Sequence, residues 1–114
     1  MHLLFVDDDQ ACLETLVDIA RASGHTVATA PDGATCLDMT SREPFERIFL
    51  DISLPDADGR DICRRIRAGG ACRNARIIAL TGDSDVVKES GNSDFDGYLL
   101  KPLSLRTLEL FLLP

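Results

Sequence analysis

Short apolar runs alternate along this chain with longer stretches in which apolar residues recur at helical spacing. The runs are too short for helices and are bounded by charged or turn residues, so they predict buried β-strands. We expect five strands, at residues 3–6, 26–30, 48–50, 76–80 and 98–100. Because strands that alternate with helices pack as a parallel sheet with helices on both faces, the pattern predicts an α/β fold.

The segments between these runs predict helices. In the first, apolar residues repeat at i, i+3, i+4 and i+7 before a glycine, as in Leu13, Leu16, Val17, Ala20 and Gly24. A weaker helix is expected over residues 34–41. A third helix carries its apolar face on Ile62, Cys63 and Ile66. Ser104 can cap a last helix, whose apolar residues are Leu105, Leu108 and Leu112.

The segment between the fourth and fifth strands has the weakest helical pattern. Its sequence "DSDVVKES", residues 83–90, spans barely two turns before Gly91-Asn92 breaks it. The helix expected here is therefore short, and the surface around it is left open by the sequence.

Length and composition fit one globular domain over residues 1–114. Hydrophobic residues make up 45% and aromatic residues only 5%, so the core is aliphatic. The net charge of −7 opposes direct contact with a nucleic-acid backbone. Because we find no apolar run near the ~20 residues of a membrane span and no basic start of a signal peptide, we expect a cytoplasmic protein without membrane contact.

The four cysteines are widely and irregularly spaced, with no Cys-x-x-Cys pair and no nearby histidine, which argues against zinc. We expect them to be reduced and mostly buried, as small hydrophobic side chains of a cytosolic protein. Cys72, beside Gly69-Gly70, is the expected exposed exception.

Polar residues follow four of the five predicted strands at their carboxyl ends. They are Asp7 and Asp8, Asp51, Thr81 and, just beyond the fifth strand, Lys101. Open parallel sheets bind ligands outside these carboxyl ends. Each residue alone has an ordinary explanation in helix capping, a turn or a solvated loop. Their convergence on one edge of one sheet favours a site.

The residue types at this edge are suited to phosphoryl transfer. Clustered carboxylate oxygens favour a hard cation such as Mg²⁺, which keeps several waters and takes phosphate oxygens as ligands. A carboxylate can attack phosphorus to give an acyl phosphate. Because this chemistry needs mainly positioning and charge neutralisation, a lysine and a threonine suffice beside the carboxylates.

Four motifs, in order, resemble the bacterial two-component response-regulator receiver domain. They are "VDDD" at residues 6–9, "LDISLPDADG" at 50–59, "ALTG" at 79–82 and "GYLLKP" at 97–102. The resemblance covers essentially the whole chain. It implies a flavodoxin-like, doubly wound, five-stranded parallel sheet in the order 2-1-3-4-5, with helices on both faces in three α/β/α layers.

The resemblance also implies the roles of the acidic residues. Asp51 would be the phosphoacceptor, and Asp8 and Asp51 would bind Mg²⁺ directly, with Mn²⁺ as a substitute. The backbone carbonyl of Ser53 would be the third protein ligand, and Asp7 would act through water. Asp9 stands apart, because a carboxylate at the start of the first helix is suited to capping it.

The remaining roles concern the switch. Lys101 would pair with Asp51 and then with the phosphoryl group, through a cis bond to Pro102. Thr81 would move onto a phosphoryl oxygen, and Tyr98 would turn inward behind it, unless it is an ordinary rim aromatic. Gly82 would allow close backbone approach to the phosphate, while Asp83, with Ser53, would tune its hydrolysis.

The implied function is a signalling receiver that catalyses only its own phosphorylation and dephosphorylation. The expected phosphoryl donor is a sensor histidine kinase or a histidine phosphotransfer protein. The terminal "LELFLLP" places Leu110, Phe111 and Leu113 on more than one face of the last helix, which favours either a contact with a dimer partner or another domain, or a packed or frayed end.

Two alternatives remain at this stage. A haloacid-dehalogenase-like phosphatase would use "DDDQA" as its Asp-x-Asp motif, with Asp7 as nucleophile and "GDSD" as an acidic metal motif, although Ala11 departs from that pattern. The other is a receiver-like interaction module that is never phosphorylated. The sequence leaves open the kinase, the stimulus, the output, the oligomeric state, the phosphoryl lifetime and whether the chain stands alone or is part of a longer regulator.

Overall fold

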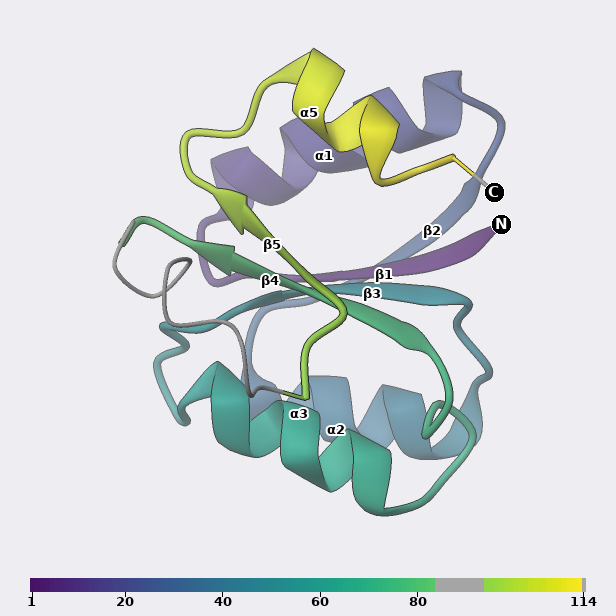
Figure 1. The fold of residues 1–114 in the computed structure, drawn as a ribbon, viewed down its shortest axis with the longest axis vertical. Coiled ribbons are helices and arrows are strands. Elements are labelled where there is room, and N and C mark those ends of the chain that lie inside the picture. The colour runs from purple at the N-terminus through teal and green to yellow at the C-terminus, as the bar shows by residue number, and fades with distance from the viewer. Residues whose placement is uncertain (84–93, 114) are drawn as a thin grey trace.

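A computed structural model describes residues 1–83 and 94–113 of the chain as an α/β fold built on one parallel sheet (Figure 1). The sheet has five strands in the order β2-β1-β3-β4-β5. Their bounds are β1 His2–Val6, β2 Thr26–Ala30, β3 Arg47–Asp51, β4 Arg76–Thr81 and β5 Gly97–Leu100. The predicted strands and their order are confirmed. Apart from Asp83, the short helix expected over residues 83–90 and the Gly91-Asn92 break after it lie outside the described residues.

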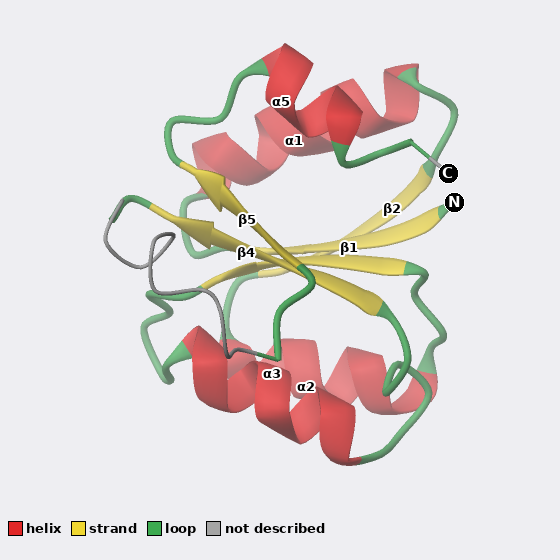
Figure 2. Ribbon diagram, in the orientation of Figure 1, coloured by secondary structure: helices red, strands yellow, loops and turns green. Residues whose placement is uncertain are grey.

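Helices cover both faces of the sheet (Figure 2). Helices α1 (Gln10–Ala22) and α5 (Leu105–Leu110) lie on one face, and α2 (Gly33–Arg42) and α3 (Gly59–Ala68) lie on the other. This arrangement is the predicted three-layer α/β/α architecture. No helix among the described residues combines the length and apolarity needed to cross a bilayer.

Alternate residues of each central strand enter two separate cores. Leu3 and Phe5 of β1 pack on the side of α1 and α5, whereas Leu4 and Val6 pack on the side of α2 and α3. Phe5 stacks on Phe49 of β3 at a centroid distance of 4.9 Å. Burial on both faces explains why these strands are continuous apolar runs rather than alternating ones.

The helices begin at polar N-caps. Asp9 accepts hydrogen bonds from the backbone N–H groups of Ala11 and Cys12 at the start of α1, which confirms the expected cap. Asp32 and Asp58 cap α2 and α3 in the same way, and Ser104 caps α5. Part of the acidic composition therefore serves local structure, because each cap satisfies helix N–H groups that have no partner within the helix.

The prediction that Cys72 is exposed is wrong. Its side chain is 1% exposed, the thiol donates to the carbonyl of Glu43 at 2.9 Å, and the N–H of Phe45 donates to the sulfur at 3.3 Å. Gly70, with φ of +99°, reverses the chain here and returns Cys72 to the core. All four cysteines are free, and the least buried is Cys12 on α1.

Candidate functional site

The carboxyl ends of the parallel strands bring the predicted polar residues to one edge of the sheet. Asp7 directly follows β1, and Asp51 ends β3 opposite Leu80 of β4. Thr81 ends β4 opposite Leu100 of β5, so Lys101 lies one residue beyond that pair. The Lys101 N–H donates to the carbonyl of Thr81 at 2.7 Å, which continues the β4–β5 ladder to the lysine.

Three carboxylates form an acidic cluster at this edge. Each of Asp7, Asp8 and Asp51 offers an oxygen, and these oxygens all lie within 4.8 Å of one another. Asp7 and Asp51 are buried, whereas Asp8 is exposed. Oxygen donors from three carboxylates, with one side of the cluster open to solvent, fit a hard cation that keeps part of its water shell, as Mg²⁺ does.

The side chain of Lys101 bridges the two buried carboxylates. Its Nζ atom lies 2.7 Å from Oδ2 of Asp7 and 3.0 Å from Oδ2 of Asp51. The bond between Lys101 and Pro102 is cis, as the resemblance implied. The pairing with Asp51 was expected, but the shorter contact with Asp7 was not.

Each buried carboxylate uses its other oxygen in a bond to the backbone two residues further on. The N–H of Asp9 donates to Oδ1 of Asp7 at 3.0 Å, and the N–H of Ser53 donates to Oδ1 of Asp51 at 2.9 Å. These local bonds fix the orientation of both side chains, because each carboxylate is bonded through both of its oxygens. The carbonyl group of Ser53 belongs to the loop that leaves β3 at this point.

The pKa values of the bridged groups move in different directions. Burial raises the pKa of Asp51, and the hydrogen bonds from Lys101 and Ser53 only partly offset it, while the nearby Asp7 raises it further. Burial also acts against ionised Asp7, but bonds from Lys101 and Asp9 outweigh it and lower the pKa of Asp7. Bonds to both carboxylates overcome burial and raise the pKa of Lys101. One ammonium thus leaves an excess of carboxylate charge that a second cation would neutralise.

The end of β4 and the neighbouring strand β5 supply the remaining residues of the predicted site. Thr81 is buried, and its Oγ1 accepts a hydrogen bond from the N–H of Asp83 at 3.1 Å. Gly82 is exposed, and a Cβ atom added there would meet nothing within 4 Å. Tyr98 lies on β5 opposite Ala79, half-buried, with its ring edge-on to that of Phe95 at 5.5 Å.

The loop after Asp51 is fixed by residues to which the sequence reasoning gave no role. Asp56 accepts hydrogen bonds from the N–H groups of Gly33 at 2.8 Å and Ala34 at 3.0 Å, and so connects this loop to the start of α2. The N–H of Gly59 donates to the carbonyl of Ile52 at 2.7 Å. The signal was present in the Asp- and Gly-rich "LPDADG", which is typical of turns and helix starts.

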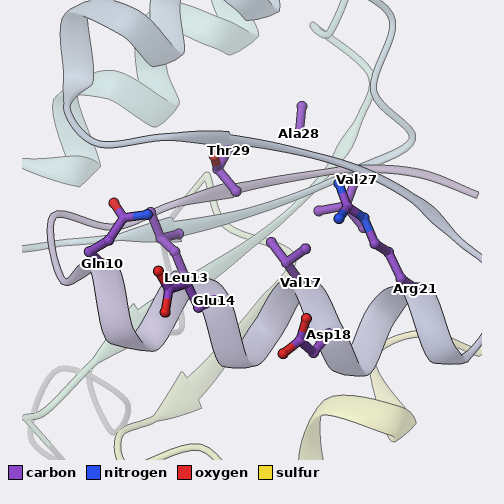
Figure 3. A pocket seen from close by; sticks show the side chains of 9 residues that line it. All are labelled: Gln10, Leu13, Glu14, Val17, Asp18, Arg21, Val27, Ala28 and Thr29. Carbon is purple, nitrogen blue, oxygen red and sulfur yellow. The ribbon is translucent and has the colours of Figure 1, made fainter.

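Two cavities adjoin helix α1. One, of about 470 Å³, lies between α1 and the edge strand β2, with Val17 pointing toward that strand (Figure 3). No residue of the predicted site lines it. The other, of about 540 Å³, lies between α1 and the segment after β5, and its walls include Cys12, Lys101 and Pro102. The second cavity therefore reaches the bridging lysine.

Comparison with known proteins matches residues 3–112 to the family described as the response regulator receiver domain. Similar curated proteins include the response regulator MprA of Mycobacterium leprae and that of Mycobacterium tuberculosis, each 34% identical over 110 residues. These matches cover 95% of this chain and 47% of the relatives, so the chain spans about half of their length.

Solved structures share the fold. A CheY-like receiver domain protein from Methanospirillum hungatei superposes with a TM-score of 0.87 at 27% identity, covering 97% of this chain and 89% of that one. The receiver domain of the sensor histidine kinase PA1611 from Pseudomonas aeruginosa gives 0.85 at 27% identity, with coverages of 97% and 93%. That structure has a magnesium ion coordinated in its active-site cleft.

Proposed function

This chain belongs to the response regulator receiver domain family, and on that premise we propose that Asp51 accepts a phosphoryl group from a phosphohistidine of a partner protein. The observation that carries the proposal is the environment of Asp51. It is a buried carboxylate at a strand end, bonded to Lys101 and to the Ser53 N–H, with two further carboxylates beside it.

In the proposed reaction an oxygen of Asp51 attacks phosphorus. The P–N bond of the donor breaks, and its electron pair stays on the imidazole nitrogen, which takes a proton from water. An acyl phosphate forms on Asp51. The ammonium of Lys101 and the hydroxyl of Thr81 then neutralise and bind the phosphoryl oxygens, in the way that phosphoryl-transfer sites stabilise equatorial charge.

We assign Mg²⁺ binding to Asp8, Asp51 and the carbonyl of Ser53, with Asp7 acting through water and Mn²⁺ as a substitute. When bound, the ion neutralises charge on the carboxylates and on the phosphoryl oxygens. The clustering of the three carboxylates and the exposure of Asp8 support this assignment. The excess negative charge around Lys101 supports it as well.

We further propose that phosphorylation shifts the domain between two conformations through Thr81 and Tyr98. The Thr81 hydroxyl would move onto the phosphoryl group, and Tyr98 would turn inward behind it. The pairing of β4 with β5 supports this coupling, because it connects the two residues through the backbone. Gly82 would allow its backbone to approach the phosphoryl group closely, because glycine carries no Cβ atom.

The wider proposal covers the domain and its partners. Residues 1–114 would form one receiver that changes only its own phosphorylation state. A sensor histidine kinase or a phosphotransfer protein would supply the phosphoryl group, and two copies would pair through the last helix or the surface beside it. The acidic net charge of −7 argues against direct nucleic-acid contact. Four free cysteines fit the reducing cytoplasm.

The environment of Asp7 argues against the phosphatase alternative. That alternative uses Asp7 as the nucleophile, but Asp7 has no exposed surface, whereas Asp51 is 5% exposed. A nucleophile needs an oxygen that the substrate can reach. The alternative also predicts steady turnover of a small phosphate ester that is abolished in Asp7→Asn and kept in Asp51→Asn.

Incubation with acetyl phosphate and Mg²⁺, followed by mass spectrometry, tests the proposal. Wild type should gain one phosphoryl group, Asp51→Asn should gain none, and the control Asp9→Asn should behave as wild type because asparagine also caps helices. An unmodified wild type that also fails to bind beryllofluoride would support the unphosphorylated interaction module instead. Modification at another aspartate would contradict the assignment of Asp51.

A further inference from the structure

A third cavity lies at the end of the sheet opposite to Asp51. It has a volume of about 310 Å³, and its walls include Arg47, Arg76, Asp96, Leu110, Phe111 and Leu113. We call it the arginine cavity. Arg47 and Arg76 are direct partners in the register of β3 and β4. Because paired residues of neighbouring strands project from the same face, both guanidinium groups lie on the side of α1 and α5.

Within the described part of the chain, no carboxylate forms an ion pair with either arginine of the arginine cavity. Among the described residues, neither Arg47 nor Arg76 has a carboxylate oxygen within 4.0 Å. Arg47 is nevertheless only 7% exposed. Burial, followed by repulsion from Arg76, lowers the pKa of Arg47, and the exposed Glu46 opposes this only in part. A buried cation beside a like charge is costly unless an anion joins it.

The acidic residue of the cavity wall is already engaged. Asp96 pairs with Nη2 of Arg67 at 2.6 Å, and the same carboxylate oxygen accepts the N–H of Ile77 at 2.9 Å. Further positive charge lies near by, because the N-terminal ammonium bonds to His25 at 2.9 Å, and His25 is in turn influenced by Arg47. This end of the sheet therefore carries the N-terminal ammonium and two arginines, together with the carboxylates of Glu46 and Asp96.

The remaining wall is apolar. Leu110 and Leu113 are 62% and 58% exposed, although both are large hydrophobic residues, and Phe111 packs beside them over Gly97. The carbonyl of Phe111 accepts a hydrogen bond from Nη1 of Arg47, so the end of α5 is fixed against the guanidinium group. A ligand that met the arginines would at the same time touch this apolar wall.

We propose that the arginine cavity binds a carboxylate carried on a short apolar group. A guanidinium presents parallel N–H donors that match the two oxygens of a carboxylate, and the leucines would cover the attached apolar group. The volume suits a small group, and the acidic net charge of the chain opposes a polyanion. Two sources share this chemistry, a free aliphatic acid and an acidic side chain beside an apolar residue in a peptide. The proposal does not depend on phosphorylation of Asp51.

Titration of the ¹⁵N-labelled chain, followed by NMR, tests the proposal with hexanoate and with its neutral isostere hexanamide. Hexanoate should shift the amide signals of Arg76 and Phe111 saturably, whereas hexanamide should bind at least about tenfold more weakly, a loss of about 1.4 kcal/mol. Arg76→Gln removes one guanidinium group from an exposed position. It should weaken the binding of hexanoate by the same factor of about ten. Arg73→Gln is the matched control, because Arg73 is also exposed but does not line the cavity, and it should bind as wild type.

The peptides acetyl-Leu-Asp-Leu-amide and acetyl-Leu-Asn-Leu-amide distinguish the two sources. Tighter binding of the aspartyl peptide than of hexanoate indicates a peptide ligand, and the reverse order indicates a free acid. The proposal is overturned if neither carboxylate binds, if the neutral probes bind equally well, or if Arg76→Gln binds hexanoate as wild type does.

Discussion

The ammonium of Lys101 lies closer to Asp7, at 2.7 Å, than to Asp51, at 3.0 Å. Asp7 is therefore more than a peripheral member of the acidic cluster. It is a fully buried anion that holds the lysine against the proposed phosphoacceptor. Removal or replacement of any one of the three charges should change both the stability of the domain and its response to pH.

Lys101→Met should destabilise the domain at pH 7 by about 2 kcal/mol, because two buried carboxylates lose their common cation. The lowered pKa of Asp7 contributes stability that is present above its unfolded pKa of roughly 3.9 and is lost as pH falls through its folded pKa. The raised pKa of Lys101 contributes stability below its unfolded pKa of roughly 10.4, which is lost as pH rises through its folded pKa. The part of the deficit that comes from Asp7 should therefore shrink only as pH falls below roughly 3.9.

Urea denaturation in EDTA at pH 7 and at about pH 3 measures this deficit. Arg106→Met is the control, since it removes the same charge from an exposed position of α5 and should cost under about 0.5 kcal/mol. Equal losses in the two variants at pH 7 would contradict a special role for the Lys101 bridge.

Asp51→Asn should stabilise the Mg²⁺-free domain by about 1 kcal/mol at pH 7, because asparagine keeps the shape and removes a buried charge next to Asp7. The raised pKa of Asp51 means that its ionisation opposes folding at pH 7 and that this penalty fades as pH falls through its folded pKa. Added Mg²⁺ should stabilise wild type more than the variant. Thermal melts with and without Mg²⁺ measure both effects. Asp18→Asn changes an exposed aspartate away from the cluster and is the control, whose melting temperature should stay near that of wild type.

Asp8→Asn should weaken Mg²⁺ binding at least about tenfold, that is by about 1.4 kcal/mol or more. Asp8 is the exposed carboxylate of the cluster, whereas the carboxylate of its neighbour Asp9 is occupied by N–H groups of α1. Asp9→Asn should therefore bind Mg²⁺ as wild type does. Isothermal titration calorimetry gives both affinities, and a similar loss in the two variants would remove the distinction between these neighbours.

Gly59→Ala should destabilise the domain by about 1–3 kcal/mol and should disturb Asp51. A Cβ atom at this position would clash with the carbonyl oxygen of Asp51 and would lie 2.7 Å from Cα of Ile52, where the backbone cannot give way easily. Helix propensity favours alanine by only about 1 kcal/mol, so the steric clash should dominate. Gly69→Ala, which meets nothing within 4 Å, is the control. Guanidinium denaturation compares the two, and an unchanged midpoint for Gly59→Ala would be inconsistent with this packing.

Thiol labelling should distinguish Cys12 from the other cysteines. Cys36, Cys63 and Cys72 are buried and should react with Ellman's reagent only on unfolding. Cys12 should react first but slowly, because burial and then the charge of Asp7 raise its pKa to about 11. Cys12→Ser should remove the native-state reaction. Faster labelling of Cys72 in the native protein would contradict its burial.

The pattern of residues alone predicts the strands and the edge on which the polar residues meet, whereas the strand order was implied by the resemblance to the receiver family. Continuous apolar runs such as residues 3–6 and 48–50 allow little besides strands buried on both faces. Parallel strands place the residues that follow them at a common edge, so Asp7, Asp51 and Lys101 could be grouped before any coordinates. Capping by Asp9 was equally predictable, because it depends on residues only two and three positions away.

Tertiary structure alone decided the contacts between residues distant in sequence. The bridge from Lys101 to Asp7, the Asp56 bonds to the start of α2 and the burial of Cys72 all depend on where separate segments meet. The position of Arg47 opposite Arg76 is also a tertiary result, because it depends on the register between β3 and β4 and not only on which residues form the two strands. Local patterns fix dihedral preferences and burial periodicity, whereas register and long-range packing are fixed only when the whole core assembles.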